Sequence, residues 1–478
     1  MPCSATSSAA CSPAGSRAEV QALSGSATPP LAHLVPRLHV VPERGWLNDP
    51  NGPAQHRGRH HLFFQEHPYA VAWGPPQWGH VSSADLVTWR RHPPALVPSA
   101  HGPDRDGCWS GCLRVIDGRP TLFYTGVTGS TDADRVESVC TATALDDDLD
   151  RWEVDPNPSI TPPPLTSPLL TSTLGTSEGG TGFARDPFVW HDDQGWHLLL
   201  GVAGGVDHHL SPDARAWTRT GTFYADDAIG GRHLECPQLL RMPDADVLVL
   251  SVQAGTHEQP RLHVVHVVGR ACGGRFTGTV AGPLEHGDAL YAPAVTQEPS
   301  GRWLLWGWLR ELVPDAELAA LGRAGALSLP MACALESGRL VLQPVAELEA
   351  LRNAALRVGA LPRQAEITAT LGGGGTMELR LSPDGAEAVV ASYDGTAVLL
   401  DRSRSSTAAW APTSSLRVPV SGRGPVRVRL LLDGSVLVLC VEGVVGAVTR
   451  VYPTSPVCGD LVPSGDVRDL RLWRLGQA

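Results

Sequence analysis

The chain has 478 residues, of which 42% are hydrophobic and 18% charged, and its formal net charge at pH 7 is −11. A chain of this length predicts two domains, because single hydrophobic cores rarely extend beyond about 250–300 residues. The composition is that of a globular protein, and the negative charge excludes the basic surface with which nucleic-acid-binding and membrane-surface proteins attract phosphate groups.

The first 35 residues are rich in Ala, Ser and Pro. They lack both the basic start and the continuous apolar stretch of a secretory signal. We therefore predict a disordered leader over residues 1–35 and a cytoplasmic location, with export by another route as the alternative. No run of about 18 apolar residues occurs anywhere, so we expect no membrane-spanning helix and no membrane partner.

Short apolar runs that follow Gly or Asp turn signals dominate the chain up to about residue 343. Five of them resemble one another and share a leucine at the second position: His61–Phe64, Thr121–Tyr124, His197–Leu200, Val247–Leu250 and Trp303–Trp306. Short strands at fairly even spacing predict an all-β protein in which residues 36–343 form a five-bladed β-propeller, with one repeated four-stranded sheet in each blade. An ordinary β-sandwich is also compatible with this repeat.

Side chains with obvious chemistry stand 13 positions before the leucines of the repeat. They are Asp49, Trp109, Arg185, Glu235 and Tyr291, and Asp186 follows Arg185 directly. In a propeller the preceding strand lies nearer the axis, so equivalent positions would ring a central channel. The repeat therefore predicts that three carboxylates from distant parts of the sequence converge in one pocket, with Trp109 and Tyr291 as candidates for contact with a sugar.

The ten cysteines are scattered along the chain. Cys108 and Cys112 lie close together, but no His/Cys pair follows them at zinc-site spacing. We expect buried thiols, and neither a metal nor another cofactor.

The pattern changes after residue 343. Apolar residues at three-to-four spacing over Val345–Leu356 predict a helix, which makes residues 344–356 a helical linker. Strongly alternating segments follow, with Asp433-Gly434 as a hairpin signal between two of them. We predict that residues 357–478 form an antiparallel β-sandwich with a supporting role.

Three acidic residues have local settings suited to cleaving a glycosidic bond, which needs a carboxylate at the anomeric carbon and a carboxylic acid at the leaving oxygen. Asp49 lies in the turn-forming segment Asn48–Gly52. Glu235 has partly apolar neighbours that would raise its pKa, and Arg185 would keep the adjacent Asp186 ionised. Each residue alone also fits a structural role, as a turn cap, a surface glutamate or a local ion pair.

Taken together, these segments resemble glycoside hydrolase family 32, the invertase, inulinase and levanase family. Trp46–Gly52 is similar to the family's opening sucrose-binding motif, Arg185-Asp186-Pro187 to its Arg-Asp-Pro motif and Glu235-Cys236 to its Glu-Cys motif. Gly325–Pro330 resembles a further family segment. The similarity runs in order from about residue 36 to residue 344 and continues more weakly beyond. Three carboxylate motifs in this order are a specific signal.

The resemblance implies a five-bladed propeller followed by a β-sandwich, and a retaining enzyme that releases fructose from terminal β-fructofuranosides. Asp49 would be the nucleophile, Glu235 the acid/base and Asp186 a stabiliser of the transition state. In a retaining enzyme the two reacting carboxyl groups lie about 5–5.5 Å apart. Around the fructosyl ring the resemblance places Asn48, Gln65, Trp73, Ser110 and Arg185, with Trp308 as an apolar wall.

Two segments depart from the family pattern near the expected rim of the pocket. These are Gln65–Pro68 and Tyr291–Pro293. The preference among sucrose, inulin and levan therefore stays open, as does the oligomeric state. A fructosyltransferase on the same scaffold is the closer alternative function, and a catalytically silent sugar-binding propeller is the more distant one.

Overall fold

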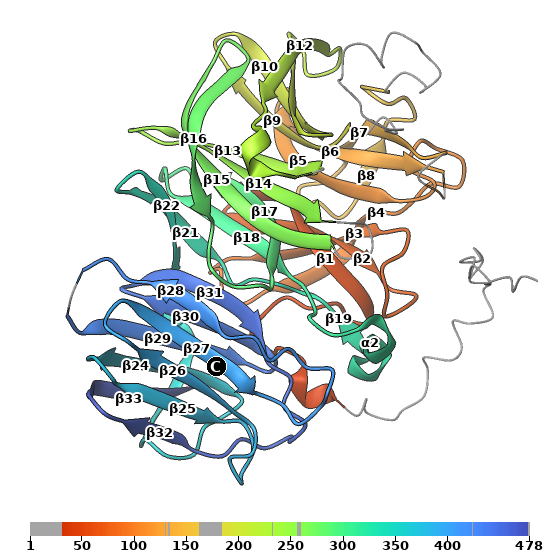
Figure 1. Ribbon diagram of the computed structural model, residues 1–478. Helices are drawn as coiled ribbons and strands as arrows, with labels where there is room; N and C mark the ends of the chain where they lie inside the picture. Colours follow the sequence, from red (N-terminus) through yellow and green to blue (C-terminus); the bar gives the residue numbers. More distant parts are fainter. Residues whose placement is uncertain are drawn as a thin grey trace, which may run out of the picture.

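The computed structural model describes residues 31–476 apart from 130, 132–133, 162–183, 232, 256–259 and 423, and these residues form an all-β structure (Figure 1). Within this part of the chain the one α-helix is α2 (Asp315–Leu321), and the 3-10 helices are η2 (Ala32–Leu34), η3 (Asp227–Ile229) and η4 (Ala346–Leu351). No helix among the described residues is long and apolar enough to cross a membrane.

Five sheets follow one another up to residue 344, and three of them belong to the first half of the chain. The first has the order β19-β1-β2-β3-β4, with β1 (Gly45–His56), β2 (Arg59–His67), β3 (Gln77–Ser83), β4 (Arg90–Leu96) and the short β19 (Arg323–Ala324). The second has the order β5-β6-β7-β8, with β5 (Cys108–Ile116), β6 (Arg119–Thr128), β7 (Val136–Ala144) and β8 (Trp152–Val154). The third has the order β12-β11-β10-β9, with β9 (Ala184–Asp192), β10 (Gly195–Val202), β11 (Gly205–Ser211) and β12 (Thr218–Tyr224).

The fourth and fifth sheets continue the same plan. The fourth has the order β13-β14-β15-β16, with β13 (His233–Arg241), β14 (Asp246–Gly255), β15 (Pro260–Cys272) and β16 (Arg275–Pro283). The fifth has the order β17-β18-β21-β22, with β17 (Leu290–Gln297), β18 (Trp303–Leu309), β21 (Met331–Glu336) and β22 (Arg339–Pro344), and β20 (Ala326–Leu327) pairs with β18.

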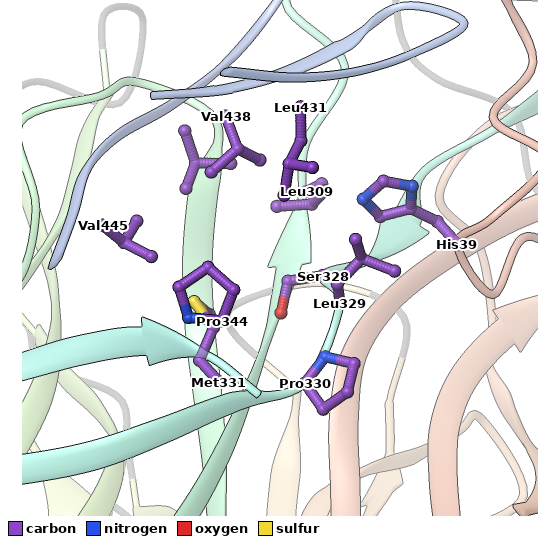
Figure 2. Close-up of a pocket in the computed structure, with 11 residues that line it drawn as sticks. His39, Leu309, Ser328, Leu329, Pro330, Met331, Pro344, Leu431, Val438 and Val445 are labelled. Carbon is purple, nitrogen blue, oxygen red and sulfur yellow. The ribbon is translucent and has the colours of Figure 1, made fainter. Parts of the chain in front are cut away.

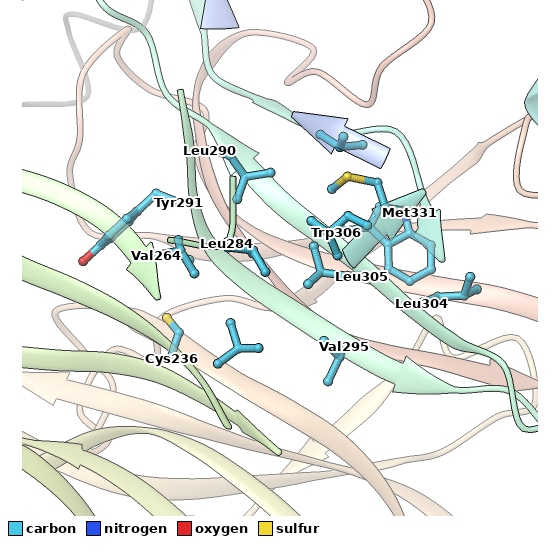
Figure 3. Close-up of a cluster of buried hydrophobic side chains, with 14 of the residues drawn as sticks. Cys236, Val264, Leu284, Leu290, Tyr291, Val295, Leu304, Leu305, Trp306 and Met331 are labelled. Atoms are coloured by element: carbon cyan, nitrogen blue, oxygen red, sulfur yellow. The ribbon is translucent and has the colours of Figure 1, made fainter. Parts of the chain in front are cut away.

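The five similar apolar runs of the sequence all lie in second strands, namely β2, β6, β10, β14 and β18. This part of the prediction is confirmed. Their shared leucines, Leu62, Leu122, Leu198, Leu248 and Leu304, are fully buried, because each lies in an apolar cluster formed by residues of neighbouring sheets. Figure 3 shows part of the core to which β18 contributes, where Leu304, Leu305 and Trp306 gather with Val295 and Met331. Full burial of such a side chain stabilises the fold by about 1.5–3 kcal/mol.

The C-terminal region consists of two sheets that lie beside the first five (Figure 1). One has the order β23-β33-β24-β29-β30-β31, with β23 (Arg352–Leu356), β24 (Gln364–Leu371), β29 (Val426–Asp433), β30 (Val436–Val441), β31 (Val444–Arg450) and β33 (Val467–Leu475). The other has the order β28-β27-β26-β25-β32, with β25 (Thr376–Arg380), β26 (Ala388–Tyr393), β27 (Ala397–Arg404), β28 (Leu416–Pro419) and β32 (Leu461–Ser464). The two sheets share one apolar core, and Asp433-Gly434 joins β29 to β30 as its hairpin signal predicts.

The helix predicted over Val345–Leu356 is wrong in its second half. Only η4 (Ala346–Leu351) is helical, and β23 then pairs antiparallel with β33. Val345, Leu348 and Leu351 are buried at a spacing of three residues, which matches the three-residue turn of a 3-10 helix. Beyond Leu351, pairing with the edge of a sheet overrides the weak intrinsic preference of the segment for a helix.

The disordered leader predicted over residues 1–35 is wrong for residues 31–35. Residues 1–30 lie outside the described residues, but η2 (Ala32–Leu34) is folded, and Leu34 is buried. The Leu34 carbonyl accepts a hydrogen bond from Ser435 N (2.8 Å) in the C-terminal region. Burial of the Leu34 side chain holds residues 31–35 against the rest of the protein. The Ala/Ser/Pro-rich composition does not predict this contact.

Asp433 of the C-terminal region binds residues 37–39, the segment before β1, through hydrogen bonds. Its Oδ2 accepts hydrogen bonds from Leu38 N (2.7 Å) and His39 Nδ1 (2.8 Å), and its Oδ1 accepts from Arg37 N (2.9 Å) and Gln364 Nε2 (3.0 Å). Burial by itself would raise the pKa of Asp433, but His39 and the two backbone amides bring it below its ordinary value. The ionised carboxylate is therefore the form that holds the two regions together.

Asp433→Ala is expected to destabilise the protein by about 3 kcal/mol at pH 7, because it leaves buried donors without an acceptor. The native carboxylate has a lowered pKa, so its contribution is present above the unfolded-state pKa of about 3.9 and is lost as pH falls through the folded-state value. Urea denaturation at pH 7 and at pH 3 measures both effects. A variant as stable as the parent at pH 7 would contradict this role.

A small apolar pocket lies at the same boundary between the fifth sheet and the C-terminal region (Figure 2). His39, Leu309, Pro344, Leu431 and Val438 are among its lining residues. Its volume of about 20 Å³ holds little more than one water molecule, so it is too small for a sugar. Asp49, Asp186 and Glu235 are not among its lining residues.

Candidate active site

The first strand of each of the five N-terminal sheets shifts its register against the second strand at a comparable place. The shifts lie between Leu47 and Pro50, Trp109 and Gly111, Arg185 and Phe188, Glu235 and Gln238, and Tyr291 and Ala294. A β-bulge of this kind bends the strand and turns its side chains in a new direction, and bulges are frequent beside active sites. The residues that the repeat predicts to be equivalent all lie at or beside these shifts.

Asp49 ends a chain of hydrogen bonds that crosses the first two sheets. Trp46 Nε1 donates to Asn48 Oδ1 (3.1 Å), and Asn48 Nδ2 donates to Gln65 Oε1 (2.9 Å). Gln65 Nε2 then donates to Ser110 Oγ (2.7 Å), and the Ser110 hydroxyl donates to Asp49 Oδ2 (2.7 Å). Every group in the chain donates towards Asp49, so the chain supports Asp49 as an ionised acceptor.

Several effects act on the pKa of Asp49. Burial raises it, the hydrogen bonds from Ser110 and Asn48 lower it, and the negative charge of Glu235 raises it, with an upward net result. The influence of Glu235 means that carboxyl groups of the first and fourth sheets lie within electrostatic reach of each other. A carboxylate in these surroundings is less hydrated than in bulk water, so its lone pairs are more available for attack on carbon.

Asp186 is held in a strained backbone conformation between the second and fourth sheets. Its φ of 61° lies in the left-handed region, which a residue with a side chain adopts only when its surroundings enforce it. The Asp186 amide donates to Thr125 Oγ1 (2.9 Å), and its Oδ2 accepts from Cys236 N (2.9 Å). Two neighbouring sheets therefore fix the orientation of this carboxyl group.

The expectation that Arg185 keeps Asp186 ionised is wrong. Burial raises the pKa of Asp186 to about 7, with further increases from the charges of Glu235 and Asp49, and these effects outweigh the lowering by Arg185. Sequence reasoning counted only the adjacent arginine, because burial and the other two carboxylates depend on residues far away in the chain. Around neutral pH this carboxyl group can either donate or accept a hydrogen bond.

Asp186→Asn is expected to be more stable than the parent at pH 8 and to lose about two thirds of this advantage at pH 5. The folded-state pKa of Asp186, about 7, exceeds the unfolded-state value of about 3.9, so the native parent loses stability as pH rises through this window, while an asparagine does not. The gain has a ceiling of about 4 kcal/mol. Urea denaturation of both proteins at the two pH values tests this, and an equal difference at both values would contradict it.

Glu235 is held by groups from two other sheets. The Tyr291 hydroxyl donates to Glu235 Oε2 (2.6 Å), and Arg185 Nη2 lies 3.7 Å from Glu235 Oε1. Figure 3 shows the Tyr291 ring at the edge of the apolar cluster with its hydroxyl directed away from it. Burial, followed by the charge of Glu235, raises the pKa of Tyr291 well above its usual value, so the phenol remains a hydrogen-bond donor.

Aromatic rings and arginines form the next wall of the site. The guanidinium of Arg185 lies 4.9 Å from the centre of the Trp109 ring, and that of Arg135 lies 5.3 Å from it. Buried Glu137 is near both cations, at 3.8 Å from Arg185 Nε and 3.4 Å from Arg135 Nε. Trp73 meets Trp109 edge-on at 5.8 Å and is 55% exposed, which leaves its ring available at the rim.

Trp308 of the fifth sheet lies beside Trp46 of the first sheet. Its ring is 5.7 Å from that of Trp46 and 6.5 Å from that of Tyr291. The eight residues expected to bind substrate thus form three connected groups. Asn48, Gln65 and Ser110 contact Asp49 or one another, Trp73, Trp109 and Arg185 form the second group, and Tyr291 and Trp308 form the third.

Sequence reasoning missed four residues that build the site. Trp46 and Cys236 lie inside the quoted motifs, so closer attention to those motifs would have included them. Thr125 and Glu137 carry no motif, and their roles depend on contacts with Asp186 and Arg185 across sheets. Only the assembled structure reveals these two residues.

One group of side chains among the residues that the structure describes has spacing compatible with a metal ion. Ligand atoms of His80, His92 and Asp150 lie within 4.8 Å of one another. The rings of His80 and His92 are stacked, however, with 4.2 Å between centroids and 24° between planes. Stacked imidazoles keep their in-plane lone pairs in two nearly parallel planes, so these lone pairs do not meet at one point. We therefore assign no metal to this group.

Carboxyl groups from three sheets, amide and hydroxyl donors and aromatic rings thus meet at one place. Two carboxyl groups on either side of a sugar are what hydrolysis of a glycosidic bond requires. Aromatic faces are apolar surfaces on which sugar rings can pack. Fold and site together therefore define an all-β protein of the glycoside hydrolase class.

Comparison with known proteins identifies the family. A family model described as the Glycosyl hydrolases family 32 N-terminal domain matches residues 39–344. A sucrose-6-phosphate hydrolase of Klebsiella pneumoniae is 36% identical over 340 residues, which cover 67% of this chain and 69% of that protein. The chain belongs to glycoside hydrolase family 32, and the resemblance drawn from its motifs is confirmed.

Solved structures of other proteins share the fold of this protein over nearly its whole chain. The sucrose-6-phosphate hydrolase of Lactobacillus gasseri has a similar fold, with a TM-score of 0.82 at 22% identity and coverage of 96% of each chain. A mutant of the GH32 β-fructofuranosidase of Bombyx mori, solved in complex with sucrose, has a TM-score of 0.76 at 25% identity and covers 93% of this chain and 94% of that one. The similarity therefore includes the C-terminal sheets.

Proposed function

We propose that this protein is a retaining β-fructofuranosidase, which releases fructose from the non-reducing end of β-fructofuranosides. The observation that carries the proposal is the meeting of Asp49, Asp186 and Glu235 from three sheets. Hydrogen bonds support this meeting, because Ser110 donates to Asp49 and accepts from Thr125, which in turn accepts from the Asp186 amide. Asp186 accepts from the amide of Cys236, the residue after Glu235. The named activities of the relatives and the sucrose-bound mutant support sucrose or a phosphorylated sucrose as the class of substrate.

We further propose that the five N-terminal sheets are the blades of a five-bladed propeller, and that the C-terminal sheets form a β-sandwich. The comparable register shifts in all five first strands support this arrangement, because blades around one axis present equivalent positions to the centre. The segment Arg323–Leu327 adds support, since it pairs with β1 of the first sheet and with β18 of the fifth.

The first chemical step is a displacement at C2 of the fructosyl unit. An oxygen of the Asp49 carboxylate forms a bond to C2, the bond from C2 to the leaving oxygen breaks, and Glu235 gives its proton to that oxygen. The products of this step are a fructosyl ester of Asp49 and the released sugar, which is glucose when the substrate is sucrose. Tyr291 and Arg185 keep Glu235 in place throughout, through contacts that do not involve the sugar.

The second step reverses these roles. The Glu235 carboxylate takes a proton from water, the water oxygen bonds to C2, and the ester bond to Asp49 breaks. Two displacements at C2 return the β configuration. Asp186, whose orientation two sheets fix, binds hydroxyl groups of the fructosyl ring and strengthens those bonds as positive charge develops on the ring.

The function is tested by incubating the enzyme with sucrose, sucrose 6-phosphate, inulin and levan in parallel and analysing the products over time. We expect free fructose together with glucose or glucose 6-phosphate from the disaccharides. Longer oligosaccharides as the main products at high sucrose would indicate a fructosyltransferase instead. No product from any fructoside would overturn the proposal.

A further inference from the structure

A short segment joins the first and fifth sheets next to the nucleophile strand. In the first sheet β19 pairs parallel with β1, with Gly45 opposite Arg323 and Trp46 opposite Ala324. In the fifth sheet β20 pairs with β18, with Trp308 opposite Leu327. Gly325 is the single residue between β19 and β20. This seam therefore meets β1 just before Asn48 and Asp49 (Figure 1).

Gly325 fits this place because nothing larger can. Its φ is 84°, and a Cβ added there would lie 1.9 Å from the Leu47 carbonyl oxygen and 3.2 Å from Trp308 Nε1. The backbone of Gly325 thus packs directly against the carbonyl group two residues before Asp49. A displacement of Gly325 would be passed to Leu47, where the register shift that presents Asp49 begins.

Glu311 holds Gly325 in this position. Its Oε1 accepts a hydrogen bond from Gly325 N (3.1 Å), and its side chain is only 7% exposed. Two side chains of the C-terminal region hold Glu311 in turn. Arg450 Nη2 lies 3.0 Å from Glu311 Oε1, and the Tyr452 hydroxyl donates to Glu311 Oε2 (2.8 Å).

Arg450 is itself fixed on both sides of this boundary. Its side chain is fully buried, Nη2 donates to the Leu309 carbonyl (2.8 Å), and Nη1 donates to Ser435 Oγ (2.7 Å). A guanidinium with this many partners has no alternative rotamer at low cost, so it is a rigid anchor for Glu311. The chain of contacts runs from Arg450 through Glu311 and Gly325 to Leu47 without a gap.

We propose that Glu311 is a positioning residue for the nucleophile, and that Arg450 and Tyr452 make the C-terminal region part of the catalytic arrangement. This inference rests on the proposed role of Asp49. Of the residues expected around the fructosyl ring, Trp308 pairs with the seam and supplies an apolar wall. Arg185 and Asp186 lie on β9 of the third sheet, whereas the seam joins the first and fifth sheets. Loss of Glu311 should therefore impair attack by Asp49 more than binding of fructose.

Glu311→Gln in the full-length protein is the test, with Glu285→Gln as the matched control. Glu285 is also a buried carboxyl group between the two regions, where Oε2 accepts from Val448 N (2.7 Å) and Gly287 N (2.6 Å), but it has no contact with Gly325. Small misplacements of a reacting group can cost about 10²-fold in rate. We expect Glu311→Gln to lower kcat on sucrose by about 10- to 100-fold while the inhibition constant of fructose changes less than about threefold.

The pH profile separates positioning from acid–base chemistry. In Glu311→Gln kcat should fall by the same factor at every pH, and in Glu285→Gln it should stay within about twofold of the parent. Equal kcat values for the two variants, or a fall matched by equal weakening of fructose binding, would overturn the inference. If Glu311→Gln fails to fold, Tyr452→Phe replaces it, because this variant removes one hydrogen bond to Glu311 and leaves the Arg450 ion pair. We expect a smaller loss of kcat than in Glu311→Gln. An unchanged kcat would contradict the inference.

Failure of this inference can be told apart from failure of the proposed function. If Asp49→Asn is inactive but Glu311→Gln has parental kcat, only the positioning role is lost. If Asp49→Asn retains activity, the proposed nucleophile itself is wrong, whatever Glu311→Gln shows.

Discussion

Asp49→Asn is expected to reduce kcat for sucrose hydrolysis by a factor on the order of 10⁴ to 10⁶, the range in which loss of a covalent nucleophile falls. The amide is nearly the same size as the carboxylate but cannot attack C2. The Ser110 hydroxyl can still donate to the amide oxygen, so the hydrogen-bond chain through Gln65 and Asn48 should survive. Steady-state kinetics on protein from a host without sucrase activity provides the measurement.

The same substitution at a structural aspartate is the control. Asp213 caps the turn between β11 and β12 through the amides of Arg215 and Ala216, and its hydrogen-bond partners in the described part of the chain include none of the three carboxylates. Asp213→Asn should keep kcat within about twofold of the parent, because a surface turn of this kind contributes little to the site. An Asp49→Asn variant within tenfold of the parent would contradict the assignment. Sucrose should still bind to it, which calorimetry can check.

Glu235→Gln is expected to lower kcat for sucrose by about 10² to 10⁴-fold, the usual contribution of a general acid or base. Gln keeps an oxygen that can accept the hydrogen bond from Tyr291, so the local geometry should be preserved. What the variant lacks is a proton to give to the leaving oxygen, together with a base to activate water.

The leaving group of the substrate distinguishes this role from a general loss of structure. β-D-Fructofuranosyl fluoride needs no proton on its leaving group, so formation of the fructosyl–enzyme should remain fast in Glu235→Gln while its breakdown becomes slow. Stopped-flow release of fluoride should then show a burst, followed by a slow steady state. Equal impairment of fluoride release and sucrose hydrolysis, with no burst, would count against Glu235 as the acid/base.

Two features could be predicted from the sequence for one physical reason. They are the strands of the repeat and the constant spacing between its reactive residues and its buried leucines. When a sheet is repeated, residues that stand equally far before the equivalent buried leucine occupy equivalent positions along their strands. Asp49 and Glu235 therefore occupy equivalent positions in their sheets. Both lie at register shifts, which the sequence does not predict. The apolar alternation that specifies the strands is local, and local patterns are what a sequence displays most directly.

Features that depend on tertiary contacts could not be predicted. The strand β23 (Arg352–Leu356) forms because it pairs with β33. Residues 31–35 are ordered because Leu34 is buried among apolar side chains and its carbonyl accepts a hydrogen bond from Ser435 N. The protonation behaviour of Asp186 reflects burial among other carboxylates.

The most direct test of the central claim is to identify the residue that carries the fructosyl group during turnover. Glu235→Gln treated with β-D-fructofuranosyl fluoride should accumulate the covalent intermediate, which peptide mass spectrometry after an acid quench can locate. We predict a mass increase of one fructosyl unit on the peptide that contains Asp49, and none in the double variant with Asp49→Asn. An adduct on a different carboxylate, or release of α-fructose without any adduct, would contradict Asp49 as the nucleophile of a retaining enzyme.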